Sequence, residues 1–247
     1  MARRKKDKVI FRAVEVIDAG ARGISVGKTP EGQVILIPNV VPGDVVDVQT
    51  FKKKKSYYEG KPIHFHQYSS DRTEPVCEHF GVCGGCKWQN MTYEKQLFFK
   101  EKEVYNNLKR IGKIELPNFE PILGSENTFF YRNKMEFSFS DSRWLTQEEI
   151  QKDEQVGDKN ALGFHIPGMW DKILDINKCH LQADPSNEIR NEIKRFAVQE
   201  NIPFYNARTL QGLLRTLMMR NTSLNEWMVL LQFFYDDPEL IEKLMSH

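Results

Sequence analysis

The sequence predicts a β-rich α+β protein in which a small closed barrel of five strands precedes an α+β domain. Short β-branched runs recur about every ten residues between positions 9 and 68, with glycine and proline between them. After position 129, strand-like alternation and helical periodicity follow one another along the chain. The 247 residues suffice for two small domains, which we place at residues 1–74 and 75–247.

Five segments form the expected barrel. They are rich in valine and isoleucine, and turn sequences such as Pro-Gly-Asp at residues 42–44 separate them. About 60 residues are enough for a barrel of this size. The expected strands lie at residues 9–17, 23–27, 34–37, 45–48 and 63–66.

A lysine run, residues 52–55, precedes two tyrosines between two of these strands. Lysine charge suits phosphates and aromatic rings suit stacking with bases. The local sequence equally fits a solvated edge hairpin whose lysines prevent pairing with another sheet. The candidates for contact with nucleic acid here are Lys53, Lys54, Lys55 and Tyr57.

The second domain combines strands with amphipathic helices. Residues 92–111 form the most regular helical pattern, and Asp184-Pro185 opens a second helix. In residues 129–139, Met135, Phe137 and Phe139 alternate with polar residues, which predicts a half-buried strand. Further strands are expected at residues 161–165, 173–176, 212–219 and 227–234, with a last helix at 239–245.

Composition and charge limit the class of protein. With 40% hydrophobic and 28% charged residues, the chain is neither disordered throughout, collagenous nor a coiled coil. No apolar run reaches the roughly 18 residues of a membrane span, and Arg12 and Glu15 interrupt any secretory signal. We therefore expect a cytoplasmic monomer without a membrane partner.

The net charge of +1 is unevenly distributed. Residues 1–74 carry 14 Lys and Arg against 9 Asp and Glu, a net of +5, and the remainder carries −4. This asymmetry favours a polyanion as partner of the N-terminal part, although solvated lysines would produce the same count.

Four cysteines are the most specific feature. Three fall within ten residues and one follows much later, and in a cytosolic chain such thiols are more often metal ligands than disulfides. The glycines at 81, 84 and 85 allow a tight fold with amide donors near sulfur, which favours an iron–sulfur cluster. A structural zinc site and unliganded thiols remain alternatives. The candidate metal ligands are Cys77, Cys83, Cys86 and Cys179.

Several motifs in this order resemble the RNA (uracil-5-)-methyltransferases, close to the enzymes that modify large-subunit (23S) ribosomal RNA. Ile-Pro-Asn-Val-Val-Pro-Gly-Asp starts at residue 37, and Cys-Gly-Gly-Cys-Lys-Trp-Gln starts at Cys83. Phe-Phe-Tyr-Arg-Asn-Lys-Met-Glu-Phe-Ser starts at residue 129, and Cys-His-Leu-Gln starts at Cys179. The resemblance covers nearly the whole chain.

The resemblance implies specific roles. The barrel becomes a TRAM domain, an OB-like RNA-binding barrel, and the four cysteines become ligands of a 4Fe–4S cluster in a domain that also touches RNA. On the exposed side of the segment at 129–139, Arg132 and Lys134 become candidates for RNA contact. The implied partner is RNA, of ribosomal origin.

The resemblance also implies chemistry that this chain does not visibly carry. Methyl transfer to C5 of uracil needs a thiolate that adds to C6, a base, and a glycine-rich site for S-adenosylmethionine. All four cysteines are assigned to the cluster, and no glycine-rich strand–turn–helix pattern follows residue 200.

We therefore predict an N-terminal portion that binds RNA and the cluster but is inactive alone. Its partner would be a C-terminal methyltransferase domain of the same polypeptide, against which helix 92–111 would pack. The alternative is a stand-alone RNA-binding iron–sulfur or zinc protein without catalysis.

Overall fold

The computed structural model describes residues 9–145, 147–151 and 157–247. The basic residues at positions 1–8, which add to the predicted N-terminal charge, lie outside the described residues. The chain divides into two compact units: residues 1–76 with 87–126, and residues 77–86 with 127–247. We describe each unit separately.

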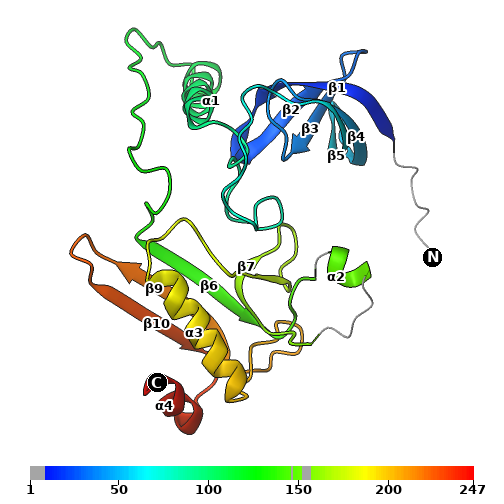
Figure 1. Ribbon diagram of the computed structural model, residues 1–247. Helices are drawn as coiled ribbons and strands as arrows, with labels where there is room; N and C mark the ends of the chain where they lie inside the picture. Colours follow the sequence, from blue (N-terminus) through cyan, green and yellow to red (C-terminus); the bar gives the residue numbers. More distant parts are fainter. Residues whose placement is uncertain (1–8, 146, 152–156) are drawn as a thin grey trace. The chain divides into compact units, whose positions relative to one another are not determined.

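The first unit is built on a closed five-stranded barrel, which confirms the predicted fold of this region (Figure 1). A short 3-10 turn, Ala21–Gly23, joins the first two strands. Neighbouring strands run in the order β1-β2-β3-β5-β4, and all pairs are antiparallel except β3 with β5. The strands are β1 (Ile10–Ala19), β2 (Ile24–Lys28), β3 (Val34–Pro38), β4 (Val45–Lys53) and β5 (Tyr57–Gln67).

The barrel core follows from period-two alternation of valine and isoleucine, since alternate side chains of a strand point inward. Val14, Ile35 and Val46 are fully buried within it. Strand β5 crosses β4 closely at Gly60, where a Cβ atom would lie 2.5 Å from the Val48 side chain. A glycine is needed at this crossing because any side chain would displace the core.

Helix α1 (Tyr93–Asn106) ends in a π-helical turn, η2 (Asn107–Ile111). It belongs to the barrel unit, because Phe99 is buried together with Ala19 and Val41. Lys102 also donates to Asp18 at 2.8 Å. The compact units therefore do not follow the predicted boundary after residue 74, since burial of an apolar side chain joins the helix to the barrel.

The second unit contains a five-stranded antiparallel sheet in the order β10-β9-β6-β7-β8. Helix α3 covers one face of this sheet (Figure 1). A single core joins sheet and helices, and Phe137, Leu217 and Ala197 lie fully buried in it. The elements are β6 (Lys134–Ser140), α2 (Gln147–Gln151), β7 (Ala161–His165), β8 (Ile173–Asp175), α3 (Ser186–Gln199), β9 (Leu214–Asn221), β10 (Trp227–Phe233) and α4 (Pro238–Met245).

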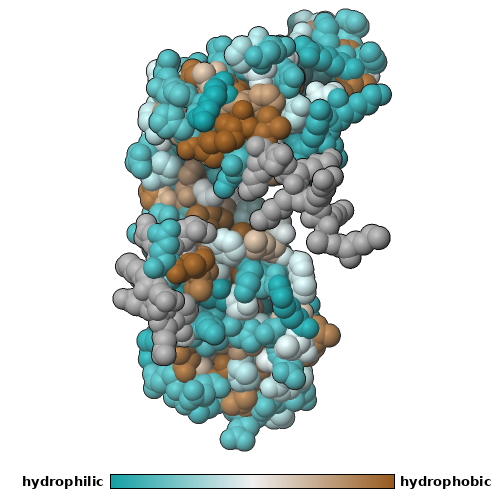
Figure 2. Space-filling model, turned by 90° about the vertical axis from the view of Figure 1, so that its right-hand side faces the viewer, coloured by the Kyte–Doolittle hydropathy of each residue, from teal (hydrophilic) through white to brown (hydrophobic). Residues whose placement is uncertain are grey.

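The second sheet and its helices confirm the predicted β-rich α+β class. On the face drawn in Figure 2, separate hydrophobic patches interrupt a mainly hydrophilic surface. Within the described residues, no helix is both long and apolar enough to cross a membrane.

Asp47 of β4 is almost fully buried and has three partners. Its carboxylate accepts a hydrogen bond from the backbone N of Ala13 at 3.0 Å, contacts His66 Nε2 at 2.7 Å and pairs with Arg12. These contacts, with His66 the largest cause, hold the pKa of Asp47 well below its ordinary value. A carboxyl with a depressed pKa stabilises the fold above its unfolded pKa of about 3.9, and this stabilisation is lost as pH falls toward the folded pKa.

We expect Asp47→Asn to lower the urea midpoint of barrel unfolding at neutral pH. The difference from the wild type should be largest above about pH 5 and should shrink as the pH is lowered, because the native carboxylate then loses its advantage. Urea unfolding at a series of pH values measures this, with the exposed Glu31→Gln in a turn as control. A difference that stays constant with pH would show that Asp47 contributes only through packing.

Candidate functional site

The predicted lysine run forms the hairpin between β4 and β5. Lys53, Lys54 and Lys55 are all exposed, and the backbone N of Lys54 donates to the Tyr57 carbonyl at 2.9 Å. Lys52 differs, because its ammonium pairs with Glu59 at 3.2 Å. In the described part of the chain, no carboxylate forms an ion pair with the other three lysines. Their charge therefore remains available to an anionic ligand.

Tyrosine rings border this hairpin. The ammonium of Lys53 lies 5.3 Å from the centre of the Tyr58 ring, which packs edge-on against Phe11 at 5.0 Å. Tyr57 is half-buried. Tyr58 thus supports the barrel as well as the lysine, and Tyr57 stays a prediction for base stacking.

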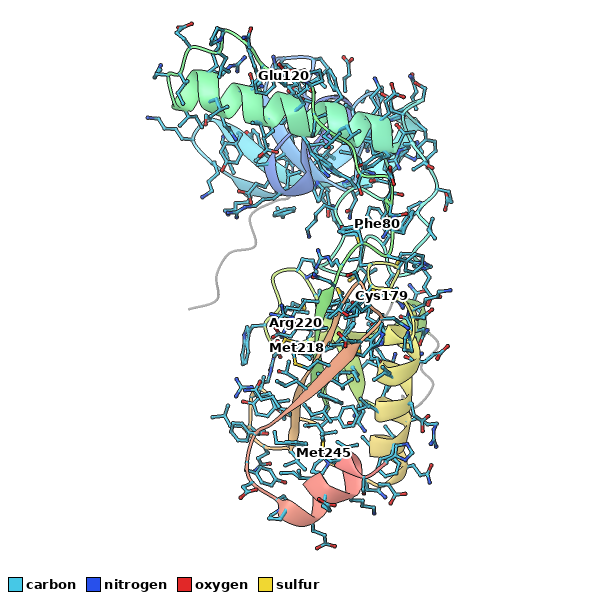
Figure 3. All side chains as sticks on the ribbon, turned by 90° about the vertical axis from the view of Figure 1, so that its left-hand side faces the viewer. Phe80, Glu120, Cys179, Met218, Arg220 and Met245 are labelled. Atoms are coloured by element: carbon cyan, nitrogen blue, oxygen red, sulfur yellow. The ribbon has the colours of Figure 1, made fainter. Side chains whose placement is uncertain are left out.

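A second basic area lies on the sheet of the second unit. We call the side of this sheet opposite α3 the open face; Figure 3 shows Met218 and Arg220 on it. Lys134 pairs in register with Arg220, which pairs with Met228 on the next strand. Arg132 is exposed just before β6, where its backbone N donates to the Leu181 carbonyl at 2.8 Å.

The structure therefore places one of the predicted RNA contacts, Lys134, beside Arg220, which is not among the residues predicted from the sequence. Arg220 follows the alternation of β9 and is exposed next to the buried Met219. Sequence pattern alone puts it on a strand surface, but only the strand order puts it beside Lys134. Glu136 lies 3.8 Å from Lys134 and offsets part of the charge.

All four cysteines belong to the second unit, and none forms a disulfide. Three lie in the loop at residues 77–86, which is shaped by backbone turns: the Cys83 N donates to the His79 carbonyl at 2.9 Å. Glycine is required at position 84, because a Cβ there would lie 2.7 Å from the His165 carbonyl. Cys83 and Cys86 pack against the same core as the buried Cys179.

The thiols share one protected environment. The pKa of Cys83 is raised to about 11, mainly by burial. The neighbouring thiols contribute to this rise, while a 3.4 Å contact from the Gly85 N opposes it. Burial likewise raises the pKa values of Cys77 and Cys179. Without a metal, Cys77, Cys83 and Cys179 are therefore protonated at neutral pH, and a metal must displace those protons to bind.

Among the residues that the structure describes, no three His, Cys, Asp or Glu side chains are arranged to hold a metal ion. The predicted iron–sulfur site is therefore not shown by the structure. The four thiols nevertheless belong to one unit, and three of them, Cys83, Cys86 and Cys179, pack against the same core.

A buried guanidinium lies next to Cys179. Arg190 is 1% exposed; its two terminal nitrogens donate to Asn187 Oδ1 at 3.0 Å and to the Asn177 carbonyl at 2.7 Å. Asn187 Oδ1 also accepts from the Cys179 N at 2.7 Å. The Arg190 Nε has no hydrogen-bond partner, and within the described ranges no carboxylate forms an ion pair with this side chain.

Burial lowers the pKa of Arg190, whereas Cys179 acts to raise it. A buried cation with an unsatisfied donor fits a negatively charged group at the cysteines, because buried charge must be paired. Arg190 is not among the site residues predicted from the sequence, because an arginine within an amphipathic helix is expected on the solvent-exposed face.

Comparison with known proteins decides the nature of the barrel. Residues 12–63 match the TRAM domain family. This match coincides with the closed barrel, and we call strands β1–β5 the TRAM barrel from here on.

The chain is similar to proteins named uncharacterized RNA methyltransferase. The relative from Bacteroides thetaiotaomicron is 51% identical over 85% of this chain and 46% of its own length. The relative from Porphyromonas gingivalis is 46% identical over 94% of this chain and 51% of its own length. The chain thus spans about half the length of the curated relatives it matches.

A solved structure has a similar fold. The tRNA (uracil-54, C5)-methyltransferase of Pyrococcus abyssi, in complex with S-adenosyl-L-homocysteine, matches with a TM-score of 0.63 and 24% identity. The match covers 93% of this chain and 48% of that chain. At this identity the likeness shows the fold alone.

These alignments correct one prediction. We predicted a non-catalytic, inactive N-terminal portion that only binds RNA and a cluster. Matches to proteins named RNA methyltransferase extend over 85% and 94% of this chain, so nearly all of it aligns with methyltransferase sequence and the prediction is wrong. The predicted separate C-terminal methyltransferase partner has no support in these comparisons either.

Proposed function

We propose that this protein acts in the methylation of uracil in RNA, with S-adenosylmethionine as methyl donor. The observation that carries the proposal is the TRAM match over residues 12–63, which coincides with a closed barrel bearing three exposed lysines. The names of the relatives and the bound product of the methyl donor in the structural neighbour support the same reaction class.

The described residues support the recognition of RNA. Lysine and arginine neutralise phosphates and hold the strand in register, while the target base must be unpaired or flipped to reach a methyl donor. Two separate basic areas serve this purpose: the β4–β5 hairpin of the TRAM barrel, and the open face near Lys134 and Arg220. S-adenosylmethionine supplies an electrophilic methyl group when bound.

Ribosomal RNA of the large subunit is the substrate that we propose. Deleting the gene should remove one 5-methyluridine from 23S ribosomal RNA, which mass spectrometry of digested RNA detects. Complementation with the wild-type gene should restore it. An unchanged 5-methyluridine content in ribosomal and transfer RNA of the deletion strain would refute the proposed reaction.

Replacing Lys53, Lys54 and Lys55 together with alanine should weaken RNA binding. Each exposed lysine that contacts a phosphate releases counterions, so the slope of log affinity against log salt should fall by about 2. Fluorescence anisotropy with a single-stranded RNA at several salt concentrations measures both quantities. The matched control replaces the same lysines with arginine, which keeps the charge. An unchanged slope in the alanine variant would remove the hairpin from the RNA-binding surface.

We further propose that Cys77, Cys83, Cys86 and Cys179 hold a 4Fe–4S cluster, whose sulfur-rich donor set they provide. The support is the common core of Cys83, Cys86 and Cys179, together with the buried Arg190, whose Nε has no hydrogen-bond partner among the described residues. When bound, such a cluster joins the loop at residues 77–86 to the core of the second unit. Zinc in the same four thiols is the alternative that metal analysis distinguishes.

A further inference from the structure

A pocket of about 380 Å³ opens in the second unit, at the end of the open face away from Lys134 and Arg220. Its size lies within the range of sites for small organic ligands. Strands β6, β7, β8 and β9 and two loops contribute the walls. Residues that line it include Ser138, His165, Trp170, Tyr205, Arg215 and Thr216.

The cation of this pocket is held in place by aromatic rings. The Arg215 guanidinium lies 5.1 Å from the centre of the Tyr205 ring and 5.9 Å from that of Phe234. In the described portion of the chain, Arg215 forms no ion pair with a carboxylate. Its hydrogen-bond donors are therefore oriented by stacking and available to an anion.

Among the described residues that line the pocket, one is a carboxylate, and it is already neutralised. Asp171 is 9% exposed and pairs with Arg208, which holds the pKa of Asp171 below its ordinary value. The charge offered to a ligand is therefore that of Arg215. This sign favours a phosphate over a cationic ligand.

Aromatic and hydroxyl groups complete the lining. The Trp170 side chain is 65% exposed, which leaves the ring accessible for stacking. Ser138 Oγ and His165 Nε2 are 3.4 Å apart, at the long limit of a hydrogen bond, so both can turn to a ligand. An exposed ring, a fixed cation and several hydroxyl and imidazole groups match the base, phosphate and sugar of a nucleotide.

The pocket also lies in line with the basic end of the open face. Thr216 lines the pocket and Arg220 stands four residues further along β9, a separation of about 13 Å along the strand. Between them the face carries Met218 and, on the neighbouring strand, the 41%-exposed Leu230. A short single strand can therefore touch both ends of the face.

We propose that this pocket receives one unpaired nucleotide of the bound RNA, with its base stacked on Trp170 and its phosphate held by Arg215. The proposal rests on the proposed function and names a new subsite within it. Single-stranded RNA is the expected ligand, because a paired base presents no free ring face to Trp170.

Photocrosslinking with a single-stranded RNA hexamer containing 4-thiouridine tests the contact directly. We expect crosslinked peptides that contain Trp170 or Tyr205, and none when the hexamer is annealed to its complement. Crosslinks confined to the TRAM barrel would overturn the proposal.

Affinity measurements with the same hexamer separate this subsite from RNA binding in general. Trp170→Ala and Arg215→Ala should each weaken binding between about fivefold and 100-fold, whereas Trp170→Phe should retain most of the affinity. Arg195→Ala, which removes an exposed arginine on α3, is the matched control. Unchanged affinity in both alanine variants, with the lysine-run variant still impaired, overturns the subsite alone. Absence of binding by the wild-type protein overturns the proposed RNA function together with the subsite.

Discussion

Replacing Asp44 with alanine should reduce the free energy of unfolding of the barrel unit by about 3–5 kcal/mol. Asp44 is completely buried at the turn between β3 and β4. Its carboxylate accepts hydrogen bonds from the backbone N of Val41 at 2.7 Å and of Ser69 at 2.9 Å. Arg72 adds two more, from Nε and a terminal nitrogen, both at 2.8 Å.

The loss of stability is large because the substitution leaves buried hydrogen-bond donors without an acceptor. Two amide donors and most of a guanidinium would lose their acceptor, and a buried unpaired charge costs far more than a lost surface ion pair. The Arg72 guanidinium also lies 4.9 Å from the centre of the Phe65 ring, so its loss of position disturbs β5. Asp44 and Arg72 together connect the β3–β4 turn, strand β5 and the segment that follows β5.

Urea unfolding followed by circular dichroism measures the effect. The control is Glu31→Ala, an exposed carboxylate in the preceding turn. A double-mutant cycle with Arg72→Ala should show strong coupling, because the two side chains lose the same interaction. A loss below about 1 kcal/mol would mean that water replaces the carboxylate without cost.

Replacing Cys179 with serine should abolish iron binding. The wild-type protein, purified without oxygen, should be brown and contain about four irons per chain. Cys179 is the one cysteine outside the loop at residues 77–86, so its loss would leave the cluster without the ligand that the core of the second unit provides. We expect iron to fall below about one per chain, since an oxygen ligand replaces thiolate poorly at such a site.

Metal analysis and the visible spectrum measure this outcome. His64→Ala, in the TRAM barrel, serves as control and should leave iron unchanged. A colourless wild-type protein with one zinc would assign the thiols to a structural zinc site instead. Iron retained in full by the serine variant would exclude Cys179 as a ligand.

The barrel could be predicted from sequence because its information is local. Alternating valine and isoleucine, interrupted by turn residues, specify each strand and its inward face without reference to distant segments. The structure confirms the five strands and closes them into a barrel. The match of residues 12–63 to the TRAM domain family agrees with that reading.

For the helix at residues 93–106, the sequence predicts the helix itself but not its packing partner. Its periodicity predicts a helix, but the sequence does not say which surface its apolar residues cover. Phe99 reaches Ala19 and Val41 of the barrel, whereas Val104 stays 50% exposed. Several elements offer apolar surfaces that this helix could cover. Its place in the barrel unit is therefore known only from the contacts that Phe99 makes in the structure.

The sequence by itself determined the barrel, the second α+β unit, the lysine run and the grouping of three cysteines, all of which depend on neighbours in the chain. Only the tertiary structure decided which distant residues meet. It placed Arg220 beside Lys134, Arg190 beside Cys179, and the walls of the pocket around Arg215. The first two pairs are separated by 86 and 11 positions, and the pocket walls come from four strands and two loops. No local propensity or spacing encodes these contacts, so strand order and core packing bring them together.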